Sequence, residues 1–478
     1  MSILRTIGRR VVVTASALSM LAISTSTFAA NGVKLTSDGN LTISQLGASV
    51  AIEGDTAIVG APLSNSVGAA LVYVRSGATW MLQETIDSPL PPTQITSGAQ
   101  MGGSVAISGD TAVIGAPRAY SGNGTVFVYT RTGASWTLQA EIGTLAAGSN
   151  GFGISVAIEN DTIVIGHPTF QQSVGPAGAA FVFTRTGSNW DLESALIAPD
   201  PKIFAEFGQS VSISSSEILV GAPKADRERE IDGEIIPRTG AAYIFSPVGA
   251  GGDWEFTQKL TDDIGETDDR FGYSVSIDGF KAIIGAPETD QMGKTNAGSA
   301  LAFEQPDPTL EWEVDFILRD NTGGSDDKFG TSVSISGDTA IVGAPGNDYG
   351  GASVGSAFVY ERDVTTTNWN QLGPKITALD ADSSAANFTT FGYSCAVSGD
   401  TFIIGMDNFP TGLTFGYAAE RSFFDCFQDL SCDGMIDGTD MGILLGNWGA
   451  PGITDLDKDG TTDGADLGIL IGAWGPCP

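Results

Sequence analysis

The sequence predicts a mainly β fold: a seven-bladed β-propeller of four-stranded antiparallel blades, closed by its N-terminal strand and followed by a small α-helical domain. Three observations support this prediction. One glycine-rich motif recurs seven times along the chain. The composition, with 63 Gly and 17% charged residues, is typical of many short strands joined by tight turns. Beyond residue 425 the motif is replaced by two acidic loops, each followed by a short apolar segment.

The repeated motif is clearest at 101–117 and 329–345, which read MGGSVAISGDTAVIGAP and FGTSVSISGDTAIVGAP. The smallest spacing between copies, from Gly102 to Gly153, is 51 residues, and the largest, from Gly208 to Gly272, is 64. Such spacings leave room for four strands of ordinary length with their turns, so each copy is predicted to form one blade. The copies begin at Gly47, Gly102, Gly153, Gly208, Gly272, Gly330 and Gly392.

Each copy is predicted to begin with a tight hairpin. In the second copy a strand at 104–107 turns through Gly109-Asp110 and returns at 112–115. Glycine at the first central position allows the positive φ that a two-residue turn requires. The Gly-Ala-Pro that follows places small residues where inner strands crowd together, and Pro117 ends the strand because it has no N–H to donate.

Six copies carry a tryptophan in the predicted fourth strand. Because these residues recur once per blade at a constant position, we expect them to pack between neighbouring sheets and not to stack on sugars. The six are Trp80, Trp136, Trp190, Trp254, Trp312 and Trp369.

The two ends of the repeat region predict how the ring closes. The seventh copy has a third-strand match at 415–421 but no fourth strand before the composition changes. The segment 32–37, GVKLTS, resembles the fourth-strand end QKLTD at 258–262, yet it precedes the first copy. We therefore predict that the N-terminal segment of the propeller, residues 31–421, supplies the outermost strand of the last blade and removes an exposed edge.

Residues 1–30 are predicted to be an export signal, because Arg5, Arg9 and Arg10 precede an apolar stretch that ends in small residues. No later apolar run reaches the roughly 18 residues needed to span a bilayer. We therefore expect a secreted protein, extracellular or at the cell surface, that is not transmembrane. The net charge of -33 disfavours nucleic acid and anionic lipid as partners and favours cations.

The two acidic loops near the C-terminus have the spacing of calcium-binding loops. Oxygen ligands at positions 1, 3, 5, 9 and 12, a carbonyl at position 7 and Gly at position 6 suit a hard cation. In the first loop Ser431 replaces a carboxylate, so this site is expected to bind calcium more weakly. The predicted ligands are Asp429, Ser431, Asp433, Met435 (carbonyl), Asp437 and Asp440 in the first loop, and Asp455, Asp457, Asp459, Thr461 (carbonyl), Asp463 and Asp466 in the second.

The repeated motif resembles the FG-GAP repeat, whose family includes the ligand-binding propeller of integrin α chains. The resemblance covers residues 31–421 and implies a propeller that binds ligands. In integrin-type copies a calcium loop separates the first two strands, whereas a two-residue turn does so here. The copies therefore resemble the short variant of the family, and calcium is not expected in these turns.

Residues 422–478 resemble a type I dockerin, with Asp at position 12 of each loop and a tandem copy of about 26 residues. The resemblance implies two bound calcium ions and docking onto a cohesin-like or other surface protein. The family uses loop positions 10 and 11 for recognition, which are Gly438-Thr439 and Gly464-Ala465 in this chain.

Three of the four cysteines lie in this C-terminal segment. A bridge between Cys426 and Cys477 would clasp a domain too small for a large core. Cys432 is a competing partner that the sequence does not exclude. Cys395, which replaces a valine in a first strand, is expected to be a buried free thiol.

Residues suited to catalysis are few. The one histidine, His167, replaces the Ala of Gly-Ala-Pro and is expected to point into a loop or blade top, without the partners of a triad or zinc site. Acidic pairs at 262–263, 268–269 and 326–327 are expected in solvated loops between blades. No enzymatic activity is therefore expected.

These features favour a secreted or cell-surface binding or scaffold protein. Its propeller loops, including the long segment 224–239, would bind a protein or a glycan, and its dockerin-like tail would mediate calcium-dependent anchoring or assembly. Two alternatives stay open: a dockerin-bearing extracellular enzyme acting on polysaccharide, and a structural envelope component without a diffusible ligand.

Overall fold

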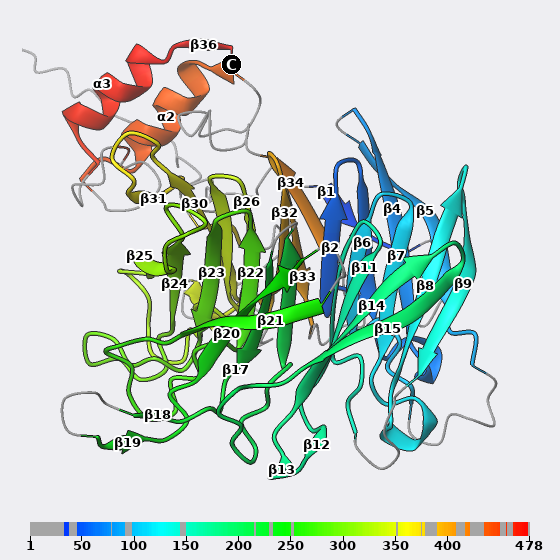
Figure 1. The fold of residues 1–478 in the computed structure, drawn as a ribbon. Coiled ribbons are helices and arrows are strands. Elements are labelled where there is room, and N and C mark those ends of the chain that lie inside the picture. Colours follow the sequence, from blue (N-terminus) through cyan, green and yellow to red (C-terminus); the bar gives the residue numbers. More distant parts are fainter. Residues whose placement is uncertain are drawn as a thin grey trace, which may run out of the picture.

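The computed structural model describes residues 33–37, 45–77, 79–90, 98–143, 150–214, 217–228, 233–249, 253–349, 352–373, 375–377, 390–407, 416–420, 435–449, 456 and 462–476. These residues form the predicted seven four-stranded antiparallel sheets, arranged as a propeller (Figure 1). The predicted export signal lies outside them. Within the described part of the chain, no helix is both long enough and apolar enough to cross a membrane.

The blades follow one another in chain order, and each runs from an inner strand to an outer strand. Blades 1 to 3 are β2 (Ser49–Glu53), β3 (Thr56–Ala61), β4 (Ala69–Ser76), β5 (Thr79–Asp87); β6 (Ser104–Ser108), β7 (Thr111–Ala116), β8 (Thr125–Thr132), β9 (Ser135–Gly143); and β10 (Ser155–Glu159), β11 (Thr162–His167), β14 (Ala179–Thr186), β15 (Asn189–Leu196). Blades 4 and 5 are β16 (Ser210–Ser214), β17 (Glu217–Ala222), β20 (Ala241–Val248), β21 (Asp253–Leu260); and β22 (Ser274–Asp278), β23 (Lys281–Ala286), β24 (Ser299–Glu304), β25 (Glu313–Leu318). Blades 6 and 7 are β26 (Ser332–Ser336), β27 (Thr339–Ala344), β30 (Ser356–Arg362), β31 (Trp369–Gln371); and β32 (Phe391–Ser398), β33 (Thr401–Met406), β34 (Gly416–Glu420) with β1 (Val33–Leu35).

Equivalent hydrogen bonds between neighbouring blades join the inner strands into a closed ring. The first serine of each inner strand donates through its hydroxyl to the carbonyl of the motif glycine in the next blade. Ser49 donates to Gly102 at 2.9 Å, and Ser394 of the last blade donates to Gly47 of the first at 2.7 Å. Because all seven interfaces carry this bond, the closing interface is equivalent to the other six.

Two glycines of the motif let neighbouring blades approach closely. A Cβ atom on Gly60, in β3, would lie 2.0 Å from the carbonyl oxygen of Gly102 in the next blade. Gly102 itself has a φ of +86°, which glycine adopts without steric cost. The same contact recurs at all seven interfaces, so the small residues predicted from the motif are required by the distance between blades.

The N-terminal strand completes the last blade, as the sequence predicted. β1 pairs antiparallel with β34, with Val33 opposite Ala418 and Leu35 opposite Gly416. Leu35 is 1% exposed and belongs to a core cluster with Val59 of the first blade. The two ends of the propeller sequence therefore close the ring together.

The core lies between adjacent sheets, and the fourth-strand tryptophans belong to it. Trp136 packs in a cluster that combines side chains of blades 1 and 2, and its indole N–H donates to Gln83 of blade 1 at 3.0 Å. Trp190 donates to Gln139 of the preceding blade at 2.9 Å in the same way. Four of the six tryptophans are buried and two are half-buried, which confirms the prediction that they pack between sheets.

Short elements extend the loops between second and third strands. They are η1 (Ser64–Ser66), η3 (Tyr120–Gly122), and the strand pairs β12 (Gln171–Gln172) with β13 (Gly175–Pro176), β18 (Arg227–Glu228) with β19 (Ile235–Ile236), and β28 (Asp348–Tyr349) with β29 (Ala352–Ser353).

After the propeller, the described residues form two helices, α2 (Gly438–Gly446) and α3 (Gly464–Gly472), and the strand pair β35 (Met435–Ile436) with β36 (Gly475–Pro476). Leu444 and Leu470, one from each helix, are 0% exposed and form the centre of a small core. Figure 1 shows both helices at the end of the propeller opposite β12–β13 and β18–β19.

This C-terminal segment has an internal symmetry. Gly449, just after α2, donates through its N–H to the carbonyl of Thr462 at 2.8 Å. Gly475, just after α3, pairs with Ile436. Gly475 lies 26 positions after Gly449, and Thr462 lies 26 positions after Ile436, so the two contacts are equivalent. Each acidic loop is therefore joined to the segment that follows the other helix.

Candidate functional site

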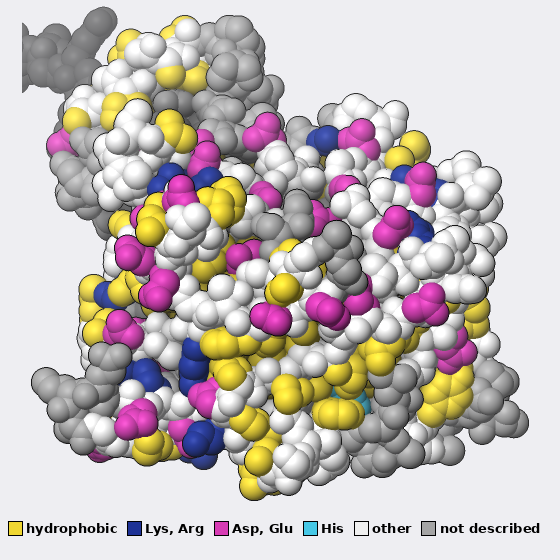
Figure 2. All heavy atoms as spheres, viewed as in Figure 1, with side chains coloured by type: hydrophobic (Ala, Val, Ile, Leu, Met, Phe, Trp, Pro, Cys, Tyr) yellow, Lys and Arg dark blue, Asp and Glu magenta, His cyan; other side chains and the backbone are white. Residues whose placement is uncertain are grey.

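The long loops of the propeller gather at one end of the ring. In an antiparallel four-stranded blade, the connections from second to third strand and from one blade to the next leave the sheet at the same end. The loops that carry β12–β13 and β18–β19 lie there (Figure 1). Figure 2 shows acidic and basic side chains side by side in the region of β18 and β19, next to hydrophobic side chains. Functional residues are expected among such loops, held by a rigid scaffold.

A pocket of about 810 Å³ opens between blades 4 and 5 at this end. Four loops line it. The connection into β16 contributes Phe204, and the loop between β17 and β20 contributes Lys224 and Arg238. The connection into β22 contributes Asp268 and Arg270, and the loop between β23 and β24 contributes Glu288 and Asn296. Four residues of the segment 224–239, which the sequence singled out as a long variable loop, thus line the pocket: Lys224, Asp226, Pro237 and Arg238.

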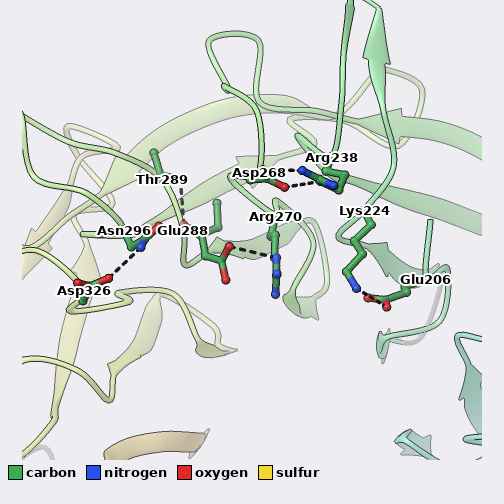
Figure 3. A network of polar contacts seen from close by, with 10 residues as sticks. Glu206, Lys224, Arg238, Asp268, Arg270, Glu288, Thr289, Asn296 and Asp326 are labelled. Carbon is green, nitrogen blue, oxygen red and sulfur yellow. Dashed lines mark hydrogen bonds and ion pairs between the residues drawn. The ribbon is translucent and has the colours of Figure 1, made fainter. Parts of the chain in front are cut away.

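Three ion pairs lie side by side in and around this pocket (Figure 3). The Lys224 ammonium is 2.6 Å from the Glu206 carboxylate, and Arg270 Nε is 3.2 Å from Glu288. Arg238 binds Asp268 through two nitrogens, with Nη2 to Oδ2 at 2.7 Å. All six side chains are partly exposed, so they can reach a ligand.

The Arg238 pair fixes the charge state at the rim of the pocket. The hydrogen bond from Arg238 lowers the pKa of Asp268, and Asp268 in turn raises the pKa of Arg238. A second carboxylate, that of Asp226, accepts a hydrogen bond from the Arg238 backbone N–H at 3.0 Å. Both partners of the exposed pair therefore stay ionised over the neutral pH range.

Phe204 is one of several residues of this pocket that sequence reasoning missed. Its side chain is 67% exposed and its φ is +63°, an unusual backbone conformation for a bulky residue. Counted from the motif glycine, the same position holds Gly98 in blade 2, Asp268 in blade 5 and Asp326 in blade 6, all with positive φ. An alignment of the seven copies shows the large apolar side chain at this position, but not its exposure.

The acidic pairs differ from the prediction of solvated loops. One carboxylate of each pair is buried: Asp262, Asp269 and Asp327 are 7%, 3% and 1% exposed. Each accepts a hydrogen bond from a backbone N–H of its own loop, as Asp269 does from Glu266 at 2.7 Å. They hold the loops in shape, and burial raises the pKa of Asp269 to about 6. Among the described residues, no group of three or more metal-binding side chains occurs.

His167 also lies elsewhere than predicted. It is the last residue of β11, is fully buried, and packs against Phe152, Phe170 and Phe181 between blades. The second strands of other blades end at the same motif position, and its alanines, such as Ala61 and Ala116, are also fully buried, so the imidazole occupies a core position and not a loop. Cys395 is a buried free thiol, as predicted, and burial raises its pKa to about 12.

Five of the predicted calcium ligands lie in the described residues: Met435, Asp437, Asp440, Asp463 and Asp466. Asp437 and Asp463 cap the N-termini of α2 and α3, and the carboxylates of Asp440 and Asp466 accept a hydrogen bond from the backbone N–H of the capping residue. The other predicted ligands, Asp429, Ser431, Asp433, Asp455, Asp457, Asp459 and Thr461, and the disulfide candidates Cys426, Cys477 and Cys432, lie outside the described residues.

A comparison with known families identifies the repeated motif. The model of the FG-GAP repeat matches residues 92–129, 136–183, 190–245, 254–303 and 312–360, together half of the chain. The chain belongs to the FG-GAP repeat family. In these repeats, the carbonyl oxygen of the first glycine of one copy lies against the second-strand glycine of the preceding copy, as Gly102 does against Gly60. No curated protein matches the chain.

FG-GAP propellers are typically binding or scaffold domains, and this one is of the short variant. Its first two strands are joined by two residues, as at Gly109-Asp110 between β6 and β7. The turn aspartate is held in place by an arginine of the third strand, with Arg131 Nε 2.7 Å from Asp110 Oδ1. That ion pair stabilises the end of the blade opposite the pocket.

Proposed function

We propose that this FG-GAP propeller is a secreted or cell-surface binding protein that presents a ligand pocket at one end and is anchored through its C-terminal domain. The observation that carries the proposal is the pocket between blades 4 and 5. Its walls come from four loops on a closed ring, and its ion-paired side chains are partly exposed. A pocket of this volume lies in the usual range for ligand sites.

The position of the C-terminal helices is consistent with ligand binding at one end of the propeller and anchoring at the other. They lie at the end of the propeller away from the pocket loops (Figure 1). An anchor at that end leaves the pocket facing outward, toward a diffusing ligand or a neighbouring surface. Ile436 pairs with Gly475, and Gly449 donates a hydrogen bond to Thr462. These two contacts each join one repeat of the C-terminal segment to the other, so the anchor would fold as a single unit.

Calcium binding by this segment is part of the proposal, and the described residues fit the ion. Asp440 and Asp466 are both 0% exposed, and a buried carboxylate is favourable only when it is hydrogen-bonded and its charge is balanced. Each occupies position 12 of an acidic loop, where calcium-binding loops place a bidentate carboxylate. When bound, calcium would supply the charge that balances these carboxylates and link each loop to its helix. In this chain Asp440 and Asp466 would hold the ion, while Asp437 and Asp463 would orient the helix ends.

The anchoring proposal is tested by calcium titration calorimetry on the full mature chain. We expect two calcium ions per chain, one after Asp466→Asn or Asp440→Asn, and none in the double variant. Asp307→Asn is the control, because Asp307 is an exposed propeller aspartate that caps its own turn. Unchanged calcium stoichiometry in the double variant would contradict the proposal.

Attachment is tested by incubating the same proteins with cell-envelope extract. The wild type and Asp307→Asn should be retained in calcium and released by a chelator, whereas the double variant should not be retained in either condition. Retention that is insensitive to chelator and to both substitutions would show that the C-terminal domain is not a calcium-dependent anchor.

A further inference from the structure

We propose that the pocket between blades 4 and 5 binds a neutral saccharide, with Phe204 as the stacking surface and the neighbouring ion pairs as hydrogen-bonding partners. This inference rests on the proposed binding function and names its ligand class. It is carried by the balance of charge in the pocket, by the mixture of donors and acceptors, and by the exposure and backbone conformation of Phe204.

The charges that line the pocket cancel. Three cationic side chains face it, and so do three carboxylates, those of Asp226, Asp268 and Glu288. A polyanion would find no net positive potential there, and the rest of the chain, with a net charge of -33, would repel it. A cationic ligand would meet Lys224, Arg238 and Arg270. A neutral ligand is repelled neither by the negative charge of the chain nor by these three cationic side chains.

The ion pairs provide donors and acceptors at neighbouring positions. Arg238 uses Nε and Nη2 for Asp268, and the opposite edge of its planar guanidinium carries further N–H groups. Carboxylate oxygens beside it accept more than one hydrogen bond each. A hydroxyl group both donates and accepts, so adjacent hydroxyls of a sugar match this pattern better than a purely accepting or purely donating ligand.

Phe204 supplies the apolar element that such a ligand requires. Its ring is 67% exposed at the rim of the pocket, and Ile203 beside it is 53% exposed. Phe204 has a left-handed backbone, which L side chains rarely adopt, and Gly98 shows that a small residue satisfies this position in the fold. Strain of this kind clusters at binding sites. An exposed aromatic ring at the rim of the pocket is suited to stacking on the C–H face of a pyranose.

The test uses the full mature chain on an array of neutral, uronic-acid and sulfated oligosaccharides, followed by calorimetry with the best neutral binder. Phe204→Gly removes the ring and also relieves the backbone strain, so we expect this variant to be at least as stable as the wild type. Phe280→Ala is the matched control, since Phe280 is 45% exposed in the two-residue turn at the opposite end of blade 5. Asp268→Asn tests the hydrogen-bonding partners.

We expect binding of neutral saccharides that weakens at least about tenfold in Phe204→Gly, weakens in Asp268→Asn, and is unchanged in Phe280→Ala. Preference for acidic saccharides, or neutral binding that is insensitive to Phe204→Gly, would overturn the assignment. If no saccharide binds but an envelope protein is retained by the wild type and lost in Phe204→Gly, the saccharide assignment is wrong and the binding function stands.

Discussion

The hydroxyl of Ser394 donates a hydrogen bond to the carbonyl of Gly47 at 2.7 Å, and this bond joins the last blade to the first. The six other interfaces have the same bond at 2.8 to 3.0 Å. The closing interface should therefore be as stable as any other, although its partners lie far apart in the sequence.

Ser394→Ala and Ser332→Ala should lower the free energy of unfolding by similar amounts, about 0.5 to 1.5 kcal/mol each, because each removes one hydrogen bond between blades. Urea denaturation followed by tryptophan fluorescence measures both. A loss in Ser332→Ala with none in Ser394→Ala would show that the ring is looser where it closes.

Gly60→Ala should destabilise the propeller by about 1 to 3 kcal/mol or more, since its Cβ would lie 2.0 Å from the Gly102 carbonyl oxygen, a backbone atom that cannot move alone. Gly143→Ala is the control: no atom lies within 4 Å of the added Cβ, and its φ is not positive. Thermal unfolding should separate the two variants, and equal melting temperatures would contradict the tight approach of blades.

Asp269→Asn should raise the free energy of unfolding at pH 7 and flatten its dependence on pH. Burial raises the pKa of Asp269 to about 6, and the carboxylates of Asp262, Glu266 and Asp290 act in the same direction. The native state therefore binds this proton more tightly than the unfolded chain, and the wild type loses stability as pH rises from about 4 through 6.

The amide introduced by Asp269→Asn keeps an oxygen for the Glu266 N–H but has no charge to bury. The gain at pH 7 should be about 1 to 3 kcal/mol, and it should vanish near pH 4, where wild-type Asp269 is protonated. Urea denaturation at pH 4, 5, 6 and 7 measures the difference between the two proteins. A constant difference across this range would show that Asp269 does not titrate there.

Phe204→Gly should leave the free energy of unfolding unchanged or raise it by up to about 1 kcal/mol, because glycine adopts φ of +63° without the steric cost of a Cβ. Phe204→Ala, which keeps the strained backbone and loses the ring, should be no more stable than the wild type. Destabilisation by Phe204→Gly would show that the ring contributes to folding, and would remove one argument for its role in binding.

Repetition made most of the fold predictable. The motif glycines, the two-residue turns and the missing seventh fourth strand were enough to predict seven blades and the pairing of β1 with β34. These are local patterns repeated along the chain, so a copy in which the motif is altered can still be assigned by comparison with the other copies. A small helical domain was predicted for the same reason, as a short apolar segment follows each acidic loop; α2 and α3 confirm these helices, and their capping by Asp437 and Asp463 was not predicted.

The pocket could not be predicted in this way, because it depends on four loops that differ from copy to copy. The segment 224–239 was recognisable as a long loop, but its contacts with Asp268 and with the connection into β16 arise only when two blades are placed side by side. The burial of Asp269 was missed for a related reason: the loop folds back on itself, so a carboxylate in an acidic sequence becomes the acceptor for its own backbone.

Closure of the ring by both ends of the propeller sequence can be tested by cross-linking, with the double variant Val33→Cys and Ala418→Cys. These residues face each other across β1 and β34 and share one core cluster, so oxidation should form a disulfide between them. Non-reducing peptide mapping should recover a peptide from the N-terminal segment linked to one around residue 418. Absence of this linked peptide in the oxidised, folded protein would contradict closure by the N-terminal strand.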